Sequence, residues 1–172
     1  KGEEHSFTYK ELSEKSNQVA NMMLDHGVKK GDMVMSVLKR HYEYWFLAYG
    51  MMKIGAILIP ATNQLMKKDF VYRFKSADVK YIVATAEDKV PEHIDNALLE
   101  YDGIAEKFIT HGCADGWIDF LSEMEKYPKT FDRIETHVED PMLLYFSSGT
   151  TGYPKMVLHR YSIAAAHILT AK

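Results

Sequence analysis

The sequence has little cysteine, no long apolar run and no excess of charge of one sign. One cysteine among 172 residues excludes a disulfide framework and is typical of a reducing compartment. No stretch approaches the roughly 18 consecutive apolar residues of a transmembrane helix, so we expect no membrane span. The formal net charge of -3 gives no electrostatic basis for binding nucleic acid or an anionic membrane.

The two ends of the chain lack the features of a complete secreted protein. We find no secretory signal peptide, and the first residue is Lys1 rather than methionine. The chain stops at Lys172 within a segment of helical pattern. We therefore expect a piece of a longer protein, located in the cytoplasm, with the mitochondrial matrix as the alternative.

What is present is a repeated alternation of helical and strand patterns. Hydrophobic residues make up 47% of the chain, which is enough for a core. Thr8 and Glu11 have the spacing of a capping box before the first helical pattern. The expected helices cover about 8–26, 41–55, 67–76, 92–101, 116–127 and 160–172. The expected strands cover 33–38, 56–60, 80–85, 107–111, 141–146 and 155–159.

This order predicts an α/β fold with alternating helices and strands, in which a mostly parallel sheet is flanked by helices. The charged stretch 126–140 is the expected long surface connection. Cys113 has no activating neighbour, and we expect it to be buried. An apolar stripe on the second helix is expected in the core, formed by Tyr42, Trp45, Phe46, Tyr49 and Met52.

One loop, SSGTTGYPK, concentrates chemistry between two strand patterns. Its hydroxyl groups belong to Ser147, Ser148, Thr150 and Thr151. Its glycines, Gly149 and Gly152, let the main chain approach a ligand closely. Successive free N–H groups in such a loop form a concave anion site. Tyr153 and Pro154 complete the exit, and Lys155 adds a full positive charge. The sequence therefore predicts a polyphosphate cradle over Ser147 to Lys155.

The loop differs from the common P-loop. That motif has four residues between its glycines and places its lysine at the start of a helix. Here two residues separate Gly149 from Gly152, and the strand pattern MVLH follows Lys155. We therefore expect the loop to join two strands. The competing interpretation is a solvated turn that is rich in serine, threonine and glycine.

The complete string resembles the signature loop of the adenylate-forming, or AMP-binding, superfamily, whose pattern is Ser/Thr-Ser/Thr-Gly-Thr-Thr-Gly-x-Pro-Lys. All its fixed positions occur between Ser147 and Lys155. The segments TYKELSEKSNQVANMMLDHGVKKGDMV and YGMMKIGAILIPATNQL also resemble that family. Met156 after the lysine, with IPATNQLMKKDFVYR and DGWIDF, is similar to the medium-chain acyl-CoA synthetase branch.

The resemblance implies that residues 1–172 are a partial amino-terminal AMP-binding domain. The implied fold is the incomplete amino-terminal part of the large domain of an acyl-CoA synthetase. The implied reaction uses ATP, Mg²⁺ and coenzyme A to convert a small carboxylic acid into its acyl-CoA thioester through an acyl-adenylate. The loop would bind the β- and γ-phosphates. No catalytic residue can be assigned, because the family's adenine, ribose and catalytic lysine positions lie downstream, and we expect the fragment alone to be inactive.

His159 closes the strand after the loop, where family members often carry histidine, and could line an acyl or phosphate pocket. A structural, hydrogen-bonded histidine is the equal alternative. His167 lies two helical turns further, but no Cys, Asp or Glu nearby completes a ligand set, so we assign no metal site. The alternative functions are an amino-acid adenylation domain, a non-catalytic nucleotide- or phosphate-binding module, and an interaction domain in which the loop is only a turn.

Overall fold

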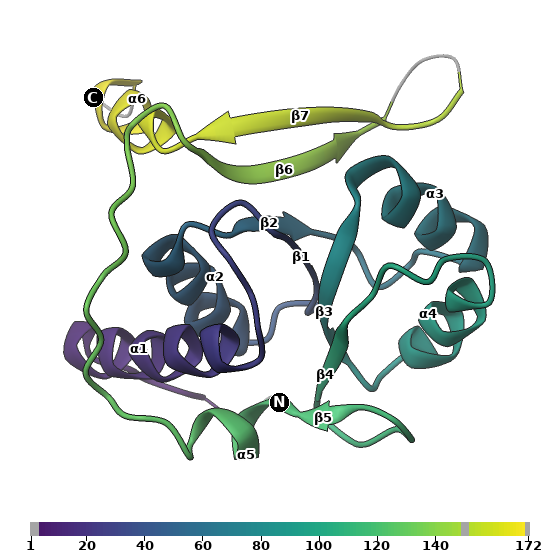
Figure 1. Cartoon of the computed structure of the whole chain (residues 1–172), viewed down its shortest axis with the longest axis horizontal. Coiled ribbons are helices and arrows are strands. Elements are labelled where there is room, and N and C mark those ends of the chain that lie inside the picture. Colours follow the sequence, from purple (N-terminus) through teal and green to yellow (C-terminus); the bar gives the residue numbers. More distant parts are fainter. Residues whose placement is uncertain (1–3, 149–151, 171–172) are drawn as a thin grey trace.

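The computed structural model describes residues 4–148 and 152–170 (Figure 1). Its helices are α1 (Tyr9–Asp25), α2 (Glu43–Ile54), α3 (Lys67–Ala77), α4 (Val90–Leu98), α5 (Phe120–Met124) and α6 (Ser162–Thr170). Its strands are β1 (Met33–Val37), β2 (Ile57–Pro60), β3 (Val79–Thr85), β4 (Glu106–Thr110), β5 (Ile118–Asp119), β6 (Pro141–Ser147) and β7 (Lys155–Arg160).

The strands form one sheet in the order β5-β4-β3-β1-β2-β6-β7. Every neighbouring pair from β5 to β6 is parallel, and only β6 and β7 pair in antiparallel fashion. The parallel strands are nearly continuous buried apolar runs, as expected for a sheet that is covered on both faces. The predicted α/β fold with a mostly parallel sheet is confirmed.

Two hydrophobic layers cover the two faces of the sheet. Helices α1, α2 and α5 pack on one face, and α3 and α4 pack on the other (Figure 1). Phe46 and Phe108 lie in the first layer, whereas Phe70 and Phe74 lie in the second. No helix in the described part of the chain is long and apolar enough to cross a membrane.

Helix α1 begins with the predicted capping box. The Thr8 hydroxyl accepts from the Glu11 main-chain N–H at 3.2 Å, and the Glu11 carboxylate accepts from the Thr8 N–H at 2.8 Å. Helix α1 then packs closely on α2. A Cβ added to Gly50 would lie 2.8 Å from Val19 Cγ1, so the glycine permits the approach of the two helices.

The predicted helix over 116–127 is wrong at both ends. Ile118 and Asp119 pair with β4 as strand β5, and α5 spans only Phe120–Met124. Asp119 caps the helix by accepting from the Ser122 N–H at 2.7 Å. The short strand is favoured because it extends the parallel ladder of β4, a long-range pairing that helical periodicity does not report.

Two burial predictions are also wrong. Trp45 and Tyr49 are 54% and 40% exposed, whereas Phe46 is buried. The two exposed rings stack on each other with their centroids 6.3 Å apart. Cys113 is exposed, because it lies in the connection between β4 and β5.

The β6–β7 hairpin joins the parallel sheet along a short seam. Its ladder with β2 has the single register pair Leu58–Leu143. At its open end, the Tyr161 hydroxyl donates to the Met52 carbonyl of α2 at 2.8 Å, and Lys30 Nζ lies 2.7 Å from the Asp140 carboxylate. The expected long connection over 126–140 precedes the hairpin and runs along the outside of α1 (Figure 1).

Candidate functional site

The glycine-rich loop connects β6 to β7, so the prediction that it joins two strands is confirmed. The antiparallel ladder runs up to the pair Ser147–Lys155, which brackets the loop. Gly149, Thr150 and Thr151 lie outside the described residues. Gly152 has φ +104°, a conformation that favours glycine, and a Cβ added to it would meet no other described atom within 4 Å.

Ser147 and Lys155 stand opposite each other at the base of the loop. The Ser147 hydroxyl lies 3.5 Å from the Lys155 carbonyl, at the outer limit of a hydrogen bond. Ser147, Ser148 and Lys155 are all exposed. Within the described part of the chain, no carboxylate pairs with the Lys155 ammonium. Its charge is therefore available to an anion, as the polyphosphate prediction requires.

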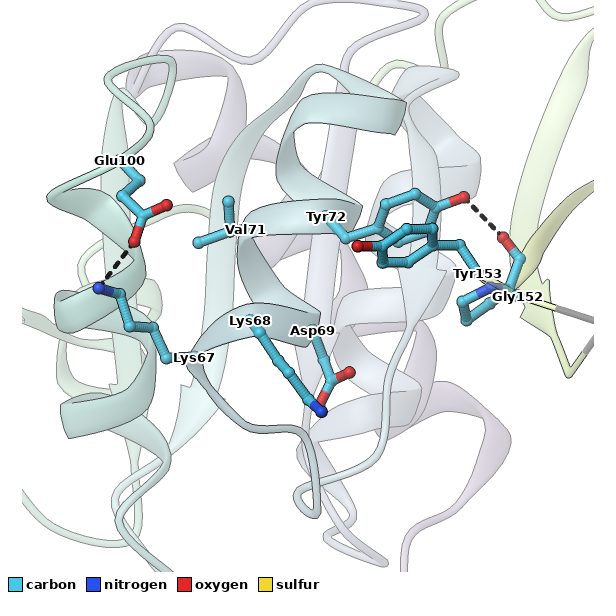
Figure 2. Close-up of a pocket in the computed structure, with 9 residues that line it drawn as sticks. Lys67, Lys68, Asp69, Val71, Tyr72, Glu100, Gly152 and Tyr153 are labelled. Carbon is cyan, nitrogen blue, oxygen red and sulfur yellow. Dashed lines mark hydrogen bonds and ion pairs between the residues drawn. The ribbon is translucent and has the colours of Figure 1, made fainter.

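Helix α3 holds the exit of the loop through Tyr72. The Tyr72 hydroxyl donates to the Pro154 carbonyl at 2.8 Å (Figure 2). The rings of Tyr72 and Tyr153 stack with centroids 4.5 Å apart and an interplanar angle of 17°. Tyr153 and Pro154 of the predicted loop are thus held against α3, a helix that no local sequence pattern links to them.

The start of the loop is supported by the neighbouring residue of the same helix. The Arg73 guanidinium lies 5.0 Å from the centroid of Phe146 on β6, in a cation–π arrangement. Burial lowers the pKa of Arg73, although nearby Asp69 opposes the shift. Consecutive residues of α3 therefore contact the end of β6 and the exit of the loop.

A cavity of about 610 Å³ lies between α3 and the loop exit. Its wall includes Lys67, Lys68, Tyr72, Glu100 and Gly152 (Figure 2). Lys67 Nζ is 2.7 Å from Glu100 Oε1, and a hydrogen bond from Lys67 lowers the pKa of Glu100. Because the charges of Lys67 and Glu100 offset each other, Lys67 is a weaker candidate for phosphate binding than the unpaired Lys155 of the loop.

His159 lies on the same strand as Lys155 but at its other end. It pairs with Leu143 across the hairpin, and its ring is 5.5 Å from that of Tyr145. Residues four apart on a strand point to one face and are separated by roughly 13 Å. His159 therefore belongs to an aromatic group over α2, at a distance from the loop, and its role in an acyl or phosphate pocket stays a prediction.

That aromatic group includes a half-buried phenol. Burial raises the pKa of Tyr44 on α2 to about 12, with a further contribution from Tyr145.

His167 lies on α6, and neither His167 nor His159 belongs to a three-ligand group within the described residues.

Comparison with known proteins identifies relatives of the whole chain. The family model described as AMP-binding enzyme matches residues 1–172. The human protein "Acyl-coenzyme A synthetase ACSM2A, mitochondrial" is 35% identical over 164 residues, which cover 94% of this chain and 28% of the relative. The mouse protein "Acyl-coenzyme A synthetase ACSM4, mitochondrial" is 34% identical over 161 residues, which cover 92% of this chain and 27% of the relative.

Solved structures share the fold. The anthranilate CoA ligase AuaEII, in complex with anthranoyl-AMP, superposes with a TM-score of 0.90 at 23% identity, over 96% of this chain and 32% of that one. The long-chain-fatty-acid-CoA ligase FadD1 of Archaeoglobus fulgidus gives a TM-score of 0.86 at 20% identity, over 98% of this chain and 33% of that one.

These structural matches show the fold, and the family model shows the membership. The chain spans only 28% of the length of the human relative. The resemblance that the loop predicts is confirmed: the chain belongs to the AMP-binding enzyme family.

Proposed function

We propose that the whole protein carrying this chain is an ATP-dependent acyl-CoA synthetase, and that residues 1–172 are the amino-terminal part of its AMP-binding domain. The observation that carries the proposal is the β6–β7 loop. It exposes the hydroxyls of Ser147 and Ser148 beside the unpaired cation of Lys155, in a chain that the family model matches throughout. Since the chain is a minor part of its relatives' length, other site residues belong to the rest of the protein.

In the first step, a carboxylate oxygen of the acid attacks the α-phosphorus of ATP. The bond from that phosphorus to the pyrophosphate oxygen breaks, and an acyl-adenylate forms. Residues from Ser147 to Lys155 bind the β- and γ-phosphates, which become the leaving pyrophosphate. Lys155 and the loop N–H groups offset the negative charge that develops there, so the loop acts by positioning and electrostatic stabilisation.

In the second step, the sulfur of coenzyme A attacks the acyl carbonyl carbon. AMP leaves with the electrons of the broken bond, the thiol proton passes to solvent, and the thioester is released.

ATP enters as its Mg²⁺ complex. The hydroxyl oxygens of Ser147 and Ser148, together with phosphate oxygens, are hard ligands that fit this cation.

The proposed acid is a medium-chain fatty acid. Met156 and the DGWIDF segment support the acyl-CoA synthetase branch over an amino-acid adenylation domain, and the relatives described above are named acyl-coenzyme A synthetases. Their names also carry the word mitochondrial, which favours the mitochondrial matrix over the cytoplasm. The remaining alternative is a nucleotide- or phosphate-binding module without catalysis.

The test is ATP–pyrophosphate exchange by the whole protein, supplied in parallel with acetate, butyrate, octanoate or benzoate. We expect exchange that depends on octanoate. Lys155→Ala removes a charged donor worth about 1.5–3 kcal/mol, so the exchange rate should fall about 10- to 100-fold. The matched control is Lys129→Ala, which removes an exposed lysine that pairs with Glu14 at 3.5 Å, outside the site.

Two results would contradict this proposal. Absence of exchange with all four acids, in a folded protein that binds ATP, would favour the non-catalytic module. An unchanged exchange rate in Lys155→Ala would show that the loop lysine takes no part in the reaction. Exchange with benzoate rather than octanoate would leave the reaction in place and replace the medium-chain assignment.

A further inference from the structure

A second group of chemically active side chains lies at the carboxyl edge of the parallel strands, away from the β6–β7 loop. His41 and Glu43 stand at the start of α2, after β1, and His111 directly follows β4. One potential ligand atom from each residue lies within 4.8 Å of those of the other two. The carboxyl edge of a parallel sheet is where α/β proteins bind ligands.

Glu43 is the unusual member of this group. Its side chain is 0% exposed, and neither carboxylate oxygen has a hydrogen-bond partner. His111 Nε2 lies 3.1 Å from Glu43 Oε1, but without hydrogen-bond geometry. A buried carboxylate without a hydrogen-bond partner is strongly unfavourable unless a positive charge compensates it. The environment of Glu43 therefore calls for a cation between it and its neighbours.

The two histidines supply the remaining donors. Their rings meet with centroids 3.7 Å apart and an interplanar angle of 63°. His111 has φ 57°, which places it in the left-handed region directly after the strand. Two imidazoles and one carboxylate form the donor set of zinc enzymes and related transition-metal sites. Tetrahedral bonds of 2.0–2.2 Å require ligand atoms roughly 3.5 Å apart, which small side-chain rotations would reach here.

The other ion pairs around the group involve Glu87 and Asp88 rather than Glu43. Glu87 Oε2 lies 3.1 Å from His41 Nε2, so a second carboxylate borders the histidine pair. Lys39 contacts Glu87 at 3.1 Å and Asp88 at 2.8 Å. The Lys39 hydrogen bond is the main cause of the lowered pKa of both carboxyl groups, so one lysine offsets part of the charge of these two outer carboxylates.

The group is also accessible. His41 and His111 line a cavity of about 1090 Å³ whose wall includes Thr62 and Asn63, the residues that follow β2. An ion can therefore enter from solvent, and coordination positions not filled by protein would face the cavity.

We propose that His41, Glu43 and His111 bind one divalent transition-metal ion of the zinc class. The ion neutralises the buried carboxylate and ties the start of α2 to the β4–β5 connection. This site is independent of the nucleotide chemistry proposed above, because its ligands come from the β1–α2 connection, the first residue of α2 and the β4–β5 connection rather than from the β6–β7 loop.

The experiment is a Zn²⁺ titration of the protein in competition with a chromogenic chelator. We expect one equivalent to bind the wild type and to raise its melting temperature. His41→Gln and His111→Gln keep side-chain size but remove a ligand, and each should weaken binding at least about 10-fold, in line with the sensitivity of metal sites to their supporting groups. His137→Gln, at an exposed histidine outside the group, is the control and should bind as the wild type does.

Circular dichroism is used to check that each variant is folded. A second measurement uses the wild type alone. X-ray absorption of the wild type loaded with one equivalent of Zn²⁺ should show two imidazole ligands. Failure of the wild type to bind Zn²⁺ would overturn the proposal. So would binding that survives in the double variant His41→Gln/His111→Gln, or a bound ion with fewer than two imidazoles.

Discussion

At the scale of single residues, Tyr72 is the group that fixes the exit of the β6–β7 loop. Its hydroxyl donates to the Pro154 carbonyl at 2.8 Å. Tyr72→Phe removes this hydrogen bond and keeps the ring stacked on Tyr153. A net loss of about 0.5–1.5 kcal/mol corresponds to a rise of roughly 2- to 10-fold in the KM for ATP of the whole protein, measured by pyrophosphate exchange.

Tyr101→Phe provides a matched control. The Tyr101 hydroxyl also donates to a main-chain carbonyl, that of Val79, at 2.9 Å, but far from the loop. We expect Tyr101→Phe to lower the melting temperature and to leave the KM for ATP unchanged. Equal KM values for Tyr72→Phe and the wild type would show that the tyrosine only stabilises the fold.

Tyr44 gives a prediction about pH. Burial, and then Tyr145, raise its pKa from the ordinary value of 10.0 to about 12. Because the folded state favours the neutral phenol, its contribution to stability is complete below pH 10.0 and is lost as the pH rises toward 12. In an ultraviolet titration of the folded protein, the difference between the wild type and Tyr44→Phe should have its midpoint near 12. A midpoint near 10 would contradict the burial of this hydroxyl.

Among the site residues, those adjacent in sequence could be predicted and those joined only by the fold could not. The hydroxyls, glycines and Lys155 form one continuous string whose chemistry is local. Tyr72 lies 82 residues before Pro154, and no local pattern links them. Likewise, His41 and His111 meet only because β1 and β4 end at the same edge of the sheet.

At the scale of elements, the contact between α1 and α2 depends on Gly50. Alanine at a helix interior normally gains about 1 kcal/mol over glycine. Here the new Cβ would lie 2.8 Å from Val19 Cγ1, and overpacking of this kind costs about 1–3 kcal/mol. We therefore expect Gly50→Ala to be destabilising in urea unfolding, despite its better helix propensity.

Val19→Ala tests the reason for that effect. It removes Val19 Cγ1, the nearest atom to the new methyl group, although the Val19 Cβ at 3.0 Å remains. In the Val19→Ala background, Gly50→Ala should be less destabilising than in the wild type. The same free-energy change in both backgrounds would mean that the two residues do not compete for space.

Helices and strands could be predicted where the apolar pattern is long. They could not be predicted where contacts between distant segments determine the strand pairing or the burial of a side chain. The strand patterns over 33–38 and 80–85 correspond to β1 and β3, which are buried on both faces. Strand β5 has two residues and exists only through its pairing with β4. The helical period marks Trp45 and Tyr49 as one stripe of α2, but it does not tell which neighbour covers them, and the structure leaves both exposed.

At the scale of the whole molecule, apolar side chains on both faces of β7 are uncovered. Met156 and Leu158 are each 48% exposed, and Val157 is 40% exposed. We expect the 172-residue chain to self-associate and to bind a hydrophobic dye, because adjacent exposed apolar side chains favour association. Leu158→Lys should reduce both signals in light scattering and dye fluorescence.

Leu99→Lys is the control for charge, because Leu99 is 80% exposed at the end of α4, away from this surface. It adds the same charge without interrupting the β7 surface, so it should change association less than Leu158→Lys. Equal effects of the two variants would assign the change to net charge.

Mechanically, the molecule has two parts, which are the parallel sheet β5–β2 with its helices (the block) and the β6–β7 hairpin. Between β2 and β6 they share a single register pair. The β1–β3 ladder runs from Met33–Val79 to Val37–Ala84, whereas Leu58–Leu143 alone joins the hairpin to β2. In native-state hydrogen exchange, the amides of β7 should exchange through local opening, while those of β1 and β3 wait for global unfolding. Because the β6–β7 loop is carried by the hairpin, its position can shift only when the β2–β6 seam and the α3 contacts of Tyr72 and Arg73 loosen, with the block intact.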